Sequence, residues 1–255
     1  YDKIYDELVE LEKQSGIILA GSPTQRVGYE ILSELPKEVH PSRMLSLDKT
    51  KSREELKEWL GDHQGILSWK LDGLTIVLTY EDGKLLKAVT RGNGDVGEVI
   101  TANAKTFVNL PHQIAYKGAL VLRGEAVISY ADFDKINSEI EDSAGKYKNP
   151  RNLCAGSVRQ LNSEITASRR VRFFAFTLVS ASDMNFKTRS EQMIWLAKQG
   201  FDTVKERLVN ADNIIETVDL FESEVQENPI PSDGLVLAFD DLEYSASLGT
   251  TAKFP

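Results

Sequence analysis

Residues 68–80 read SWKLDGLTIVLTY, and this stretch guides the interpretation of the rest of the chain. Its β-branched and aliphatic residues predict a strand that carries a lysine near its start and an aspartate two residues later. In an extended segment Lys70 and Asp72 point to the same face, so the amine and the carboxylate can share one site. An amine held in this way can lose its proton and act as a nucleophile. The alternative, an edge strand with a solvated lysine and aspartate, is more common for these residues taken alone.

Composition argues against several classes of protein. The chain has 255 residues with 41% hydrophobic and 27% charged side chains, which is typical of a soluble globular protein. No apolar run has the length of a membrane span, and no signal-peptide pattern opens the sequence. The net charge of −9 argues against a general nucleic-acid binder. Cys154 is the only cysteine, which excludes an intrachain disulfide, fits a reducing cytoplasm and argues against a zinc site.

One segment is basic although the chain as a whole carries a negative net charge. Between Lys146 and Arg172 there are seven basic residues and a single acidic one, Glu164. A local basic surface of this kind is compatible with a track for phosphate groups. A solvated face of a loop and a helix explains the same charges equally well, and both interpretations stay open at this point.

The remaining patterns predict short strands and helices in mixed order. Helical spacing indicates helices over 1–14, 52–60, 101–107, 130–140, 155–161, 190–200 and 211–228. Strand-like runs cover 44–48, 85–90, 119–127 and 172–179, another strand begins near residue 231, and turns are predicted at 81–84 and 149–152. Strands joined by short turns favour an α+β fold with antiparallel sheets flanked by helices over alternating βαβ units.

The predicted strand over 119–127 carries two charged residues, Arg123 and Glu125, inside an apolar run. Charged side chains are rarely buried without a partner. Either these residues pair with each other or with neighbours, or Glu125 faces a ligand, and the local sequence leaves both possibilities open.

Five motifs occur in an order that resembles the covalent nucleotidyltransferases. They are Lys70-Leu71-Asp72-Gly73, Thr90-Arg91-Gly92-Asn93-Gly94, Arg123-Gly124-Glu125, Phe173-Phe174-Ala175-Phe176 and Asp233-Gly234-Leu235-Val236-Leu237. Four more stretches resemble bacterial NAD-dependent DNA ligases more specifically, namely residues 22–28, 44–48, 149–152 and 156–161. The resemblance covers essentially the whole chain and implies a nucleotidyltransferase (ATP-grasp-like) domain.

The resemblance also implies a reaction. In the family, the lysine that matches Lys70 attacks the adenylyl phosphorus of NAD, releases nicotinamide mononucleotide (NMN) and holds AMP as a phosphoramide. AMP then passes to the 5′-phosphate at a nick in duplex DNA, and the 3′-hydroxyl closes the bond. This chemistry needs a neutral amine, neutralised phosphate charge and an aligned leaving group. The implied protein is a monomeric, cytoplasmic bacterial enzyme of DNA replication and DNA repair, with no membrane partner.

Site residues are carried over from the family motif by motif. Lys70, Asp72 and Arg91 are the expected catalytic residues, and Arg91 would contact the ribose or the phosphate. Glu125 would accept hydrogen bonds from the ribose hydroxyls, and Phe176, where the family usually has tyrosine, would stack on adenine. The full set expected to bind NAD or AMP is Tyr1, Asp2, Ser46, Leu47, Ser68, Trp69, Lys70, Arg91, Glu125 and Phe176.

The resemblance assigns two further groups of side chains. Asp72 and Asp233 are expected to orient the lysine or to help hold Mg²⁺, through water. The expected contacts to DNA are Arg151, Arg159 and Arg169.

The resemblance divides the chain into two parts. Residues 1–40 correspond to the remnant of a small helical NMN-binding domain plus a connector, with Tyr1 and Asp2 from that domain. Residues 41–255 correspond to the adenylation domain, truncated before its last motif. We expect the final catalytic lysine, an OB-fold, a zinc finger and helix-hairpin-helix modules beyond Pro255, so zinc would belong only to a domain absent here.

Two positions depart from the family pattern. Ser68 stands where the family usually has glutamate, and Ala238 stands where it has a lysine close to the adenylyl phosphate. Losing that charge would weaken transition-state stabilisation by ~2–4 kcal/mol. A metal ion or another basic side chain takes its place, or the chain is a divergent paralogue with low activity. Two other hypotheses are an ATP-using nucleotidyltransferase and a non-catalytic protein that clamps nicked DNA through Arg151, Arg159 and Arg169.

Overall fold

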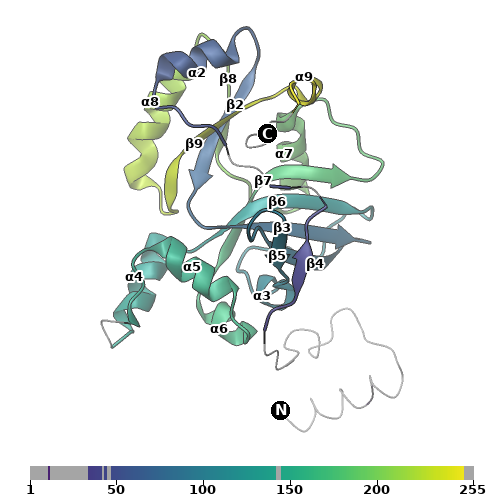
Figure 1. Ribbon diagram of the computed structural model, residues 1–255, viewed down its shortest axis with the longest axis vertical. Helices are drawn as coiled ribbons and strands as arrows, with labels where there is room; N and C mark the ends of the chain where they lie inside the picture. Colours follow the sequence, from purple (N-terminus) through teal and green to yellow (C-terminus); the bar gives the residue numbers. More distant parts are fainter. Residues whose placement is uncertain (1–10, 12–33, 42, 45–46, 142–144, 250–255) are drawn as a thin grey trace.

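The computed structural model describes residue 11 and residues 34–41, 43–44, 47–141 and 145–249 (Figure 1). These residues form three antiparallel sheets with helices packed around them. The predicted α+β fold, with antiparallel sheets flanked by helices, is therefore confirmed. No helix in these ranges is long and apolar enough to cross a membrane.

Several predictions fall outside the described ranges. They concern the helix over 1–14, the stretch 22–28, and the expected ligand-binding residues Tyr1, Asp2 and Ser46. Of the strand expected over 44–48, the described residues Met44, Leu47 and Asp48 belong to no strand.

The larger sheet has four strands in the order β4-β3-β6-β7. They are β4 (Lys84–Thr90), β3 (Leu74–Glu81), β6 (Leu120–Val127) and β7 (Arg172–Ala181). β3 and β4 form the predicted hairpin, in which Asp82 (φ 50°) and Gly83 (φ 75°) adopt the left-handed conformation that tight turns require. The expected strands over 85–90, 119–127 and 172–179 are thus present, with slightly different ends.

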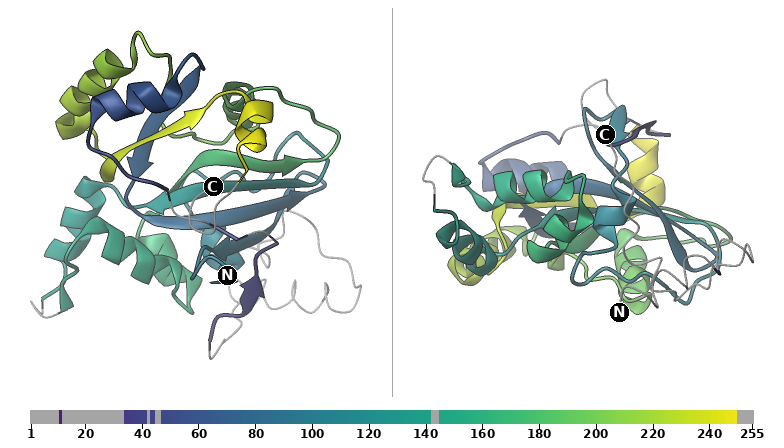
Figure 2. Two further views of the ribbon diagram at one scale, coloured as in Figure 1. Left: turned by 45° about the horizontal axis from the view of Figure 1, so that its top comes forward. Right: turned by 90° about the horizontal axis from the view of Figure 1, so that it is seen from below.

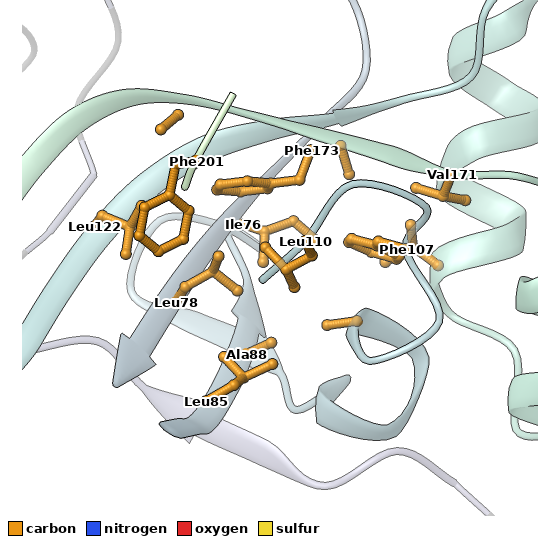
Figure 3. Packing of buried hydrophobic residues seen from close by; sticks show 14 of the residues in the cluster. Ile76, Leu78, Leu85, Ala88, Phe107, Leu110, Leu122, Val171, Phe173 and Phe201 are labelled. Atoms are coloured by element: carbon orange, nitrogen blue, oxygen red, sulfur yellow. The ribbon is translucent and has the colours of Figure 1, made fainter. Parts of the chain in front are cut away.

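One face of the larger sheet packs into the main core. Its buried side chains include Ile76, Leu78, Leu122, Phe173 and Phe201 (Figure 3). α7 (Arg189–Lys198) packs on β7 and adds Met193 and Leu196 to the same cluster. Because side chains alternate along a strand, the opposite face carries Thr75 of β3 and its cross-strand partner Glu125 of β6.

The smaller sheet has the order β8-β2-β9, and its strands are β8 (Glu206–Val209), β2 (Gly65–Leu71) and β9 (Ser232–Phe239). α2 (Arg53–Leu60) and α8 (Ile214–Glu224) lie together beside this sheet (Figure 2). Leu67 and Trp69 point into the core under these helices, where the rings of Trp69 and Phe221 are 5.3 Å apart. Ser68 and Lys70 consequently lie on the opposite face of β2.

The single strand expected over 68–80 is wrong, because this stretch forms the end of β2 and most of β3, which belong to different sheets. The chain crosses between the sheets at Asp72 and Gly73. The peptide N–H of Asp72 donates to Pro231 O at 2.8 Å. A Cβ on Gly73 would lie 1.9 Å from Ala126 O, so only glycine fits where the crossing passes β6. Hydrophobic periodicity does not reveal such a crossing, because both strands are apolar.

The other elements complete the chain. They are β1 (Lys37–Val39), β5 (Val96–Glu98), α3 (Thr101–Ala104), α4 (Tyr130–Ser138), α5 (Pro150–Val158), α6 (Ser163–Ser168), the 3₁₀ helix η3 (Val225–Glu227) and α9 (Leu242–Ser247). The turn expected at 149–152 is wrong. The helix expected at 155–161 is present, but it lies earlier in the chain, as α5, and ends at Val158. α5 already begins at Pro150, because the Asn149 side chain accepts from Asn152 N and proline suits the first helical turn.

Candidate active site

Lys70 lies near the end of β2, opposite Gly234 of β9. Its Nζ donates to both carboxylate oxygens of Asp233, at 2.6 and 2.8 Å. Each side chain of this pair is 40% exposed, so the pair is open to a ligand from solvent. The Asp233 carboxylate fixes the position of the amine and is the nearest described group that can take a proton from it.

Asp72, two residues beyond the lysine, has a different partner. Its Oδ1 accepts a hydrogen bond from Arg151 Nη1 at 3.0 Å. Arg151 comes from the first turn of α5, so a helix far along the chain contributes a charge to this region. Lys70 and Asp72 thus take part in separate ion pairs, one across the small sheet and one toward α5.

Glu125 links the sheet crossing to β6. Its Oε1 accepts from Gly73 N at 3.1 Å, and its Oε2 accepts from Thr75 Oγ1 at 2.9 Å. Burial raises the pKa of Glu125 to about 7, while these hydrogen bonds and the charges of Arg151 and Lys70 act in the opposite direction. The sequence left open whether Glu125 pairs with neighbouring groups or faces a ligand. In the structure its carboxylate is hydrogen-bonded to Gly73 and Thr75, where the chain crosses from the small sheet to the larger one.

Two guanidinium groups lie on the polar side of the larger sheet. Arg91 directly follows β4, and its Nη2 donates to Met44 O at 3.2 Å. Arg123 of β6 lies across from Val77 of β3. Burial lowers the pKa of the Arg123 guanidinium, and the positive charge of Arg91 lowers it further. Two cations within electrostatic range of each other form a local positive region that suits a phosphate group.

Phe176 occupies an irregular position in β7. Ala175 is paired with Gly124 and Thr177 with Arg123, so Phe176 is the extra residue of a β-bulge. Its half-buried ring is available on the surface of the sheet for a stacking contact. The strand pattern in the sequence gives no sign of this bulge.

Ser68 and Trp69 differ in where their side chains point. Ser68 shares the face of Lys70, and its Oγ is 3.5 Å from Val236 O. The Trp69 side chain is buried in the core on the other face, so only its backbone can contribute to a site at Lys70. Leu47 lies in an irregular, exposed segment.

A cavity of about 390 Å³ opens on the far side of β2 from Lys70. Trp69 and Leu71 line it together with Phe174 of β7 and Pro229. Because alternate residues of β2 face opposite ways, this cavity is separate from the Lys70 amine.

The predicted DNA contacts lie along α5 and α6. Arg151 is committed to Asp72, whereas Arg159 is exposed and its Nη1 is 3.9 Å from Glu98. The Arg169 guanidinium lies 6.0 Å from the centre of the Tyr147 ring. Figure 2 shows α4, α5 and α6 grouped at one edge of the molecule. Arg151 lies in the first turn of α5, and Arg159 and Arg169 directly follow α5 and α6.

Several groups of the candidate site could not be predicted from the sequence motifs. Thr75 and Gly73 N, which hold Glu125, sit within the signature stretch but carry no signal of that role. Glu206 lies directly across from Ser68, a pairing between residues far apart in sequence. Only the register of the sheet brings these groups to the site.

The sequence of the chain matches one family of known proteins. Residues 32–255 match the family model described as NAD-dependent DNA ligase adenylation domain. The DNA ligases of Lachnoclostridium phytofermentans and Ruminiclostridium cellulolyticum are 64% and 62% identical to the chain. Each alignment covers the whole chain but only 39% of the relative, so the chain spans well under half of their length. Among solved structures, an archaeal ATP-dependent RNA ligase aligns with 79% of this chain and 46% of its own, at 14% identity and a TM-score of 0.48.

Proposed function

Because the chain belongs to the family of NAD-dependent DNA ligase adenylation domains, we propose that it catalyses the first step of nick sealing. The lone pair of Lys70 Nζ attacks the adenylyl phosphorus of NAD, a nitrogen–phosphorus bond forms, and the bond to the NMN phosphate breaks. NMN leaves with the bonding electrons, and AMP stays on the lysine. The observation that carries this proposal is the placement of Lys70, which presents its amine beside the Asp233 carboxylate at the meeting point of the two sheets.

The amine must be neutral to attack. The Asp233 oxygens, 2.6 and 2.8 Å from Nζ, are placed to accept a proton from Lys70 and to hold the nitrogen in line. Arg91 and Arg123 supply positive charge from the neighbouring sheet, which would stabilise the charge that develops on the phosphate. The phosphate therefore binds between the lysine and these guanidinium groups.

Two side chains of the larger sheet are candidates for binding the rest of the nucleotide. Glu125 is fixed by Gly73 and Thr75, so its oxygens can accept hydrogen bonds from ribose hydroxyls without moving. Phe176 offers a ring at the bulge of β7 for stacking on adenine. The assignment of Glu125 is supported by its electrostatic interaction with Lys70.

We expect magnesium to bind together with the substrate and not directly to protein side chains. Among the described residues there is no group of three or more acidic, histidine or cysteine side chains that could hold a metal ion. Asp72 and Asp233 are each already paired with a cation. These residues do not fit a direct metal site, so we propose that Mg²⁺ accompanies the dinucleotide phosphates and contacts the protein through water.

The later steps belong to the longer protein. Arg151 of α5, together with Arg159 and Arg169, which directly follow α5 and α6, would contact the phosphates of nicked duplex DNA. In replication and repair such a protein would work as a monomer in the bacterial cytoplasm, where both NAD and DNA are found. Residues 1–40 would then link the adenylation domain to the part that binds NMN.

A catalytically weakened ligase is the second candidate, and one observation favours it. Ala238 lies opposite Ile66 on the face of the small sheet that also carries Lys70. A lysine there would point toward the same side as the nucleophile, and alanine provides no charge. The arginines of the larger sheet would have to compensate.

Mass spectrometry of the intact full-length protein tests the proposal. The protein is treated with Mg²⁺ and either NAD or ATP, with Lys70→Ala as the control, and is also measured before treatment because it can be purified already adenylated. An AMP adduct that forms with NAD and is absent in Lys70→Ala is expected. An adduct formed with ATP alone would assign the chain to ATP-dependent chemistry. No adduct in a verified unadenylated, folded protein would leave a DNA-binding role.

A further inference from the structure

Glu206 is the first residue of β8 and lies directly across from Ser68 of β2. Cross-strand partners share a face, so Glu206 lies on the same face as Ser68 and Lys70. The next residue, Arg207, turns to the opposite face, where its guanidinium is 6.0 Å from the centre of the Phe221 ring. The carboxylate of Glu206 therefore belongs to the side of the small sheet that presents the nucleophile.

The charged groups near Glu206 are Asp240 and Arg189, and both already have hydrogen-bond partners. Asp240 accepts hydrogen bonds from Ser190 N at 2.8 Å and Ser190 Oγ at 3.0 Å. Arg189 Nε donates to Phe239 O at 3.4 Å. Within the described ranges, by contrast, no hydrogen bond or ion pair to the Glu206 carboxylate occurs.

This carboxylate is half-buried and has no hydrogen-bond donor among the described residues. Burial raises the pKa of Glu206 to about 7, Asp240 raises it further and Arg189 lowers it. The oxygens of Glu206 are only partly shielded from water, so a ligand donor can reach them and would meet a weakly solvated acceptor. The local structure therefore favours a polar ligand group at this position.

The distance from the nucleophile suits a nucleotide. Glu206 is one strand across and two residues along from Lys70, which places the two backbone positions about 8 Å apart. Between them on this face lies only the small Ser68 side chain of β2, which leaves room for a planar base. A base attached through ribose and phosphate to Lys70 would bring its far edge toward Glu206.

We propose that Glu206 selects adenine by accepting a hydrogen bond from the exocyclic amino group at carbon 6 of the base. This inference rests on the proposed function and adds a specificity-determining residue to it. Above a pH of about 7 the Glu206 carboxylate is ionised and only accepts hydrogen bonds, so in that pH range it attracts the amino group of adenine and repels the carbonyl oxygen of hypoxanthine at the same place. The Ser68 hydroxyl is directed toward Val236 O instead.

The test compares NAD with nicotinamide hypoxanthine dinucleotide in single-turnover adduct formation by the full-length protein. The wild type is expected to favour NAD about 30-fold or more. In Glu206→Gln the ratio should fall below about threefold, because an amide can rotate to accept from an amino group or donate to a carbonyl. Glu224→Gln is the matched control. Glu224 pairs with Lys205 at 2.6 Å rather than with the nucleotide face, so its ratio should stay at the wild-type value.

The outcomes separate this inference from the proposed function. A wild type that forms no adduct with NAD contradicts the proposed function, whereas an active wild type whose ratio is unchanged in Glu206→Gln overturns only the role of Glu206. An equal loss with both dinucleotides would make Glu206 a structural residue and also overturns it. Thermal melting checks folding, and if Glu206→Gln is unfolded, Glu206→Asp takes its place, with a reduced ratio expected because the shorter acid cannot reach the base. Calorimetric binding of AMP and inosine monophosphate gives the same comparison without the reaction.

Discussion

Glu125 Oε2 accepts the hydroxyl hydrogen of Thr75 at 2.9 Å across the β3–β6 strand pair. The same carboxylate accepts the peptide N–H of Gly73 at 3.1 Å, where the chain passes from the small sheet to the large one. One half-buried acid of β6 is therefore tied both to the sheet crossing at Gly73 and to the start of β3. Stability and the proposed ribose contact depend on the same residue.

The first prediction concerns the pH dependence of stability. Burial raises the pKa of Glu125 from its usual 4.5 to about 7, so the folded state holds this proton more tightly than the unfolded state does. The stabilising contribution is complete below pH 4.5 and is lost as pH rises through 7. Glutamine does not titrate, so Glu125→Gln does not lose stability in this way. The unfolding free energy of Glu125→Gln minus that of the wild type should therefore rise by about 3 kcal/mol at most between pH 4 and 8. Denaturant titrations at several pH values measure the difference. Parallel curves for the two proteins would contradict the expectation.

The second prediction concerns Asp233→Asn. The Lys70–Asp233 pair is 40% exposed on each side, so its loss should change the unfolding free energy by less than about 1 kcal/mol. Adduct formation with NAD should slow roughly 100-fold or more, because the amide does not accept the proton from the amine. Stopped reactions analysed by mass give the rate, and thermal melting gives the stability. A rate close to wild type would show that Asp233 has no part in preparing the amine.

The third prediction concerns Gly73→Ala. The added Cβ would lie 1.9 Å from Ala126 O, a backbone atom that cannot move away on its own. We expect a loss of at least about 2 kcal/mol in unfolding free energy, together with loss of adduct formation. Gly156→Ala is the matched control, because its Cβ would meet nothing closer than the Tyr147 ring at 3.4 Å. Chemical denaturation of both variants measures the contrast, and similar stabilities would contradict the close approach at Gly73.

The fourth prediction concerns Ala238→Lys. If Arg91 and Arg123 already supply the positive charge at the phosphate, the added lysine should change the rate of adduct formation by less than about threefold. Single-turnover rates with saturating NAD provide the measurement. A gain of about tenfold or more would instead show that the natural chain lacks a charge at this position, as a weakened ligase would.

Much of the candidate site was predictable because its residues occur in short motifs. Lys70, Asp72, Arg91, Glu125 and Asp233 each stand beside a glycine or within a recognisable run, and these local signals do not depend on the fold. The partners of these residues were not predictable. Lys70 pairs with Asp233 and Asp72 pairs with Arg151 because strands and helices far apart in the chain meet, which no periodicity encodes.

The sequence by itself determined the family and the α+β class, and it singled out Lys70 as the proposed nucleophile, because composition, local patterns and motif order are properties of the chain. Only the tertiary structure decided that residues 68–80 divide between two sheets, that Trp69 turns away from the site and that Glu206 faces Ser68. The physical reason is register. Strand pairing and the close approach at Gly73 depend on contacts between distant segments, and these contacts fix which face each side chain occupies.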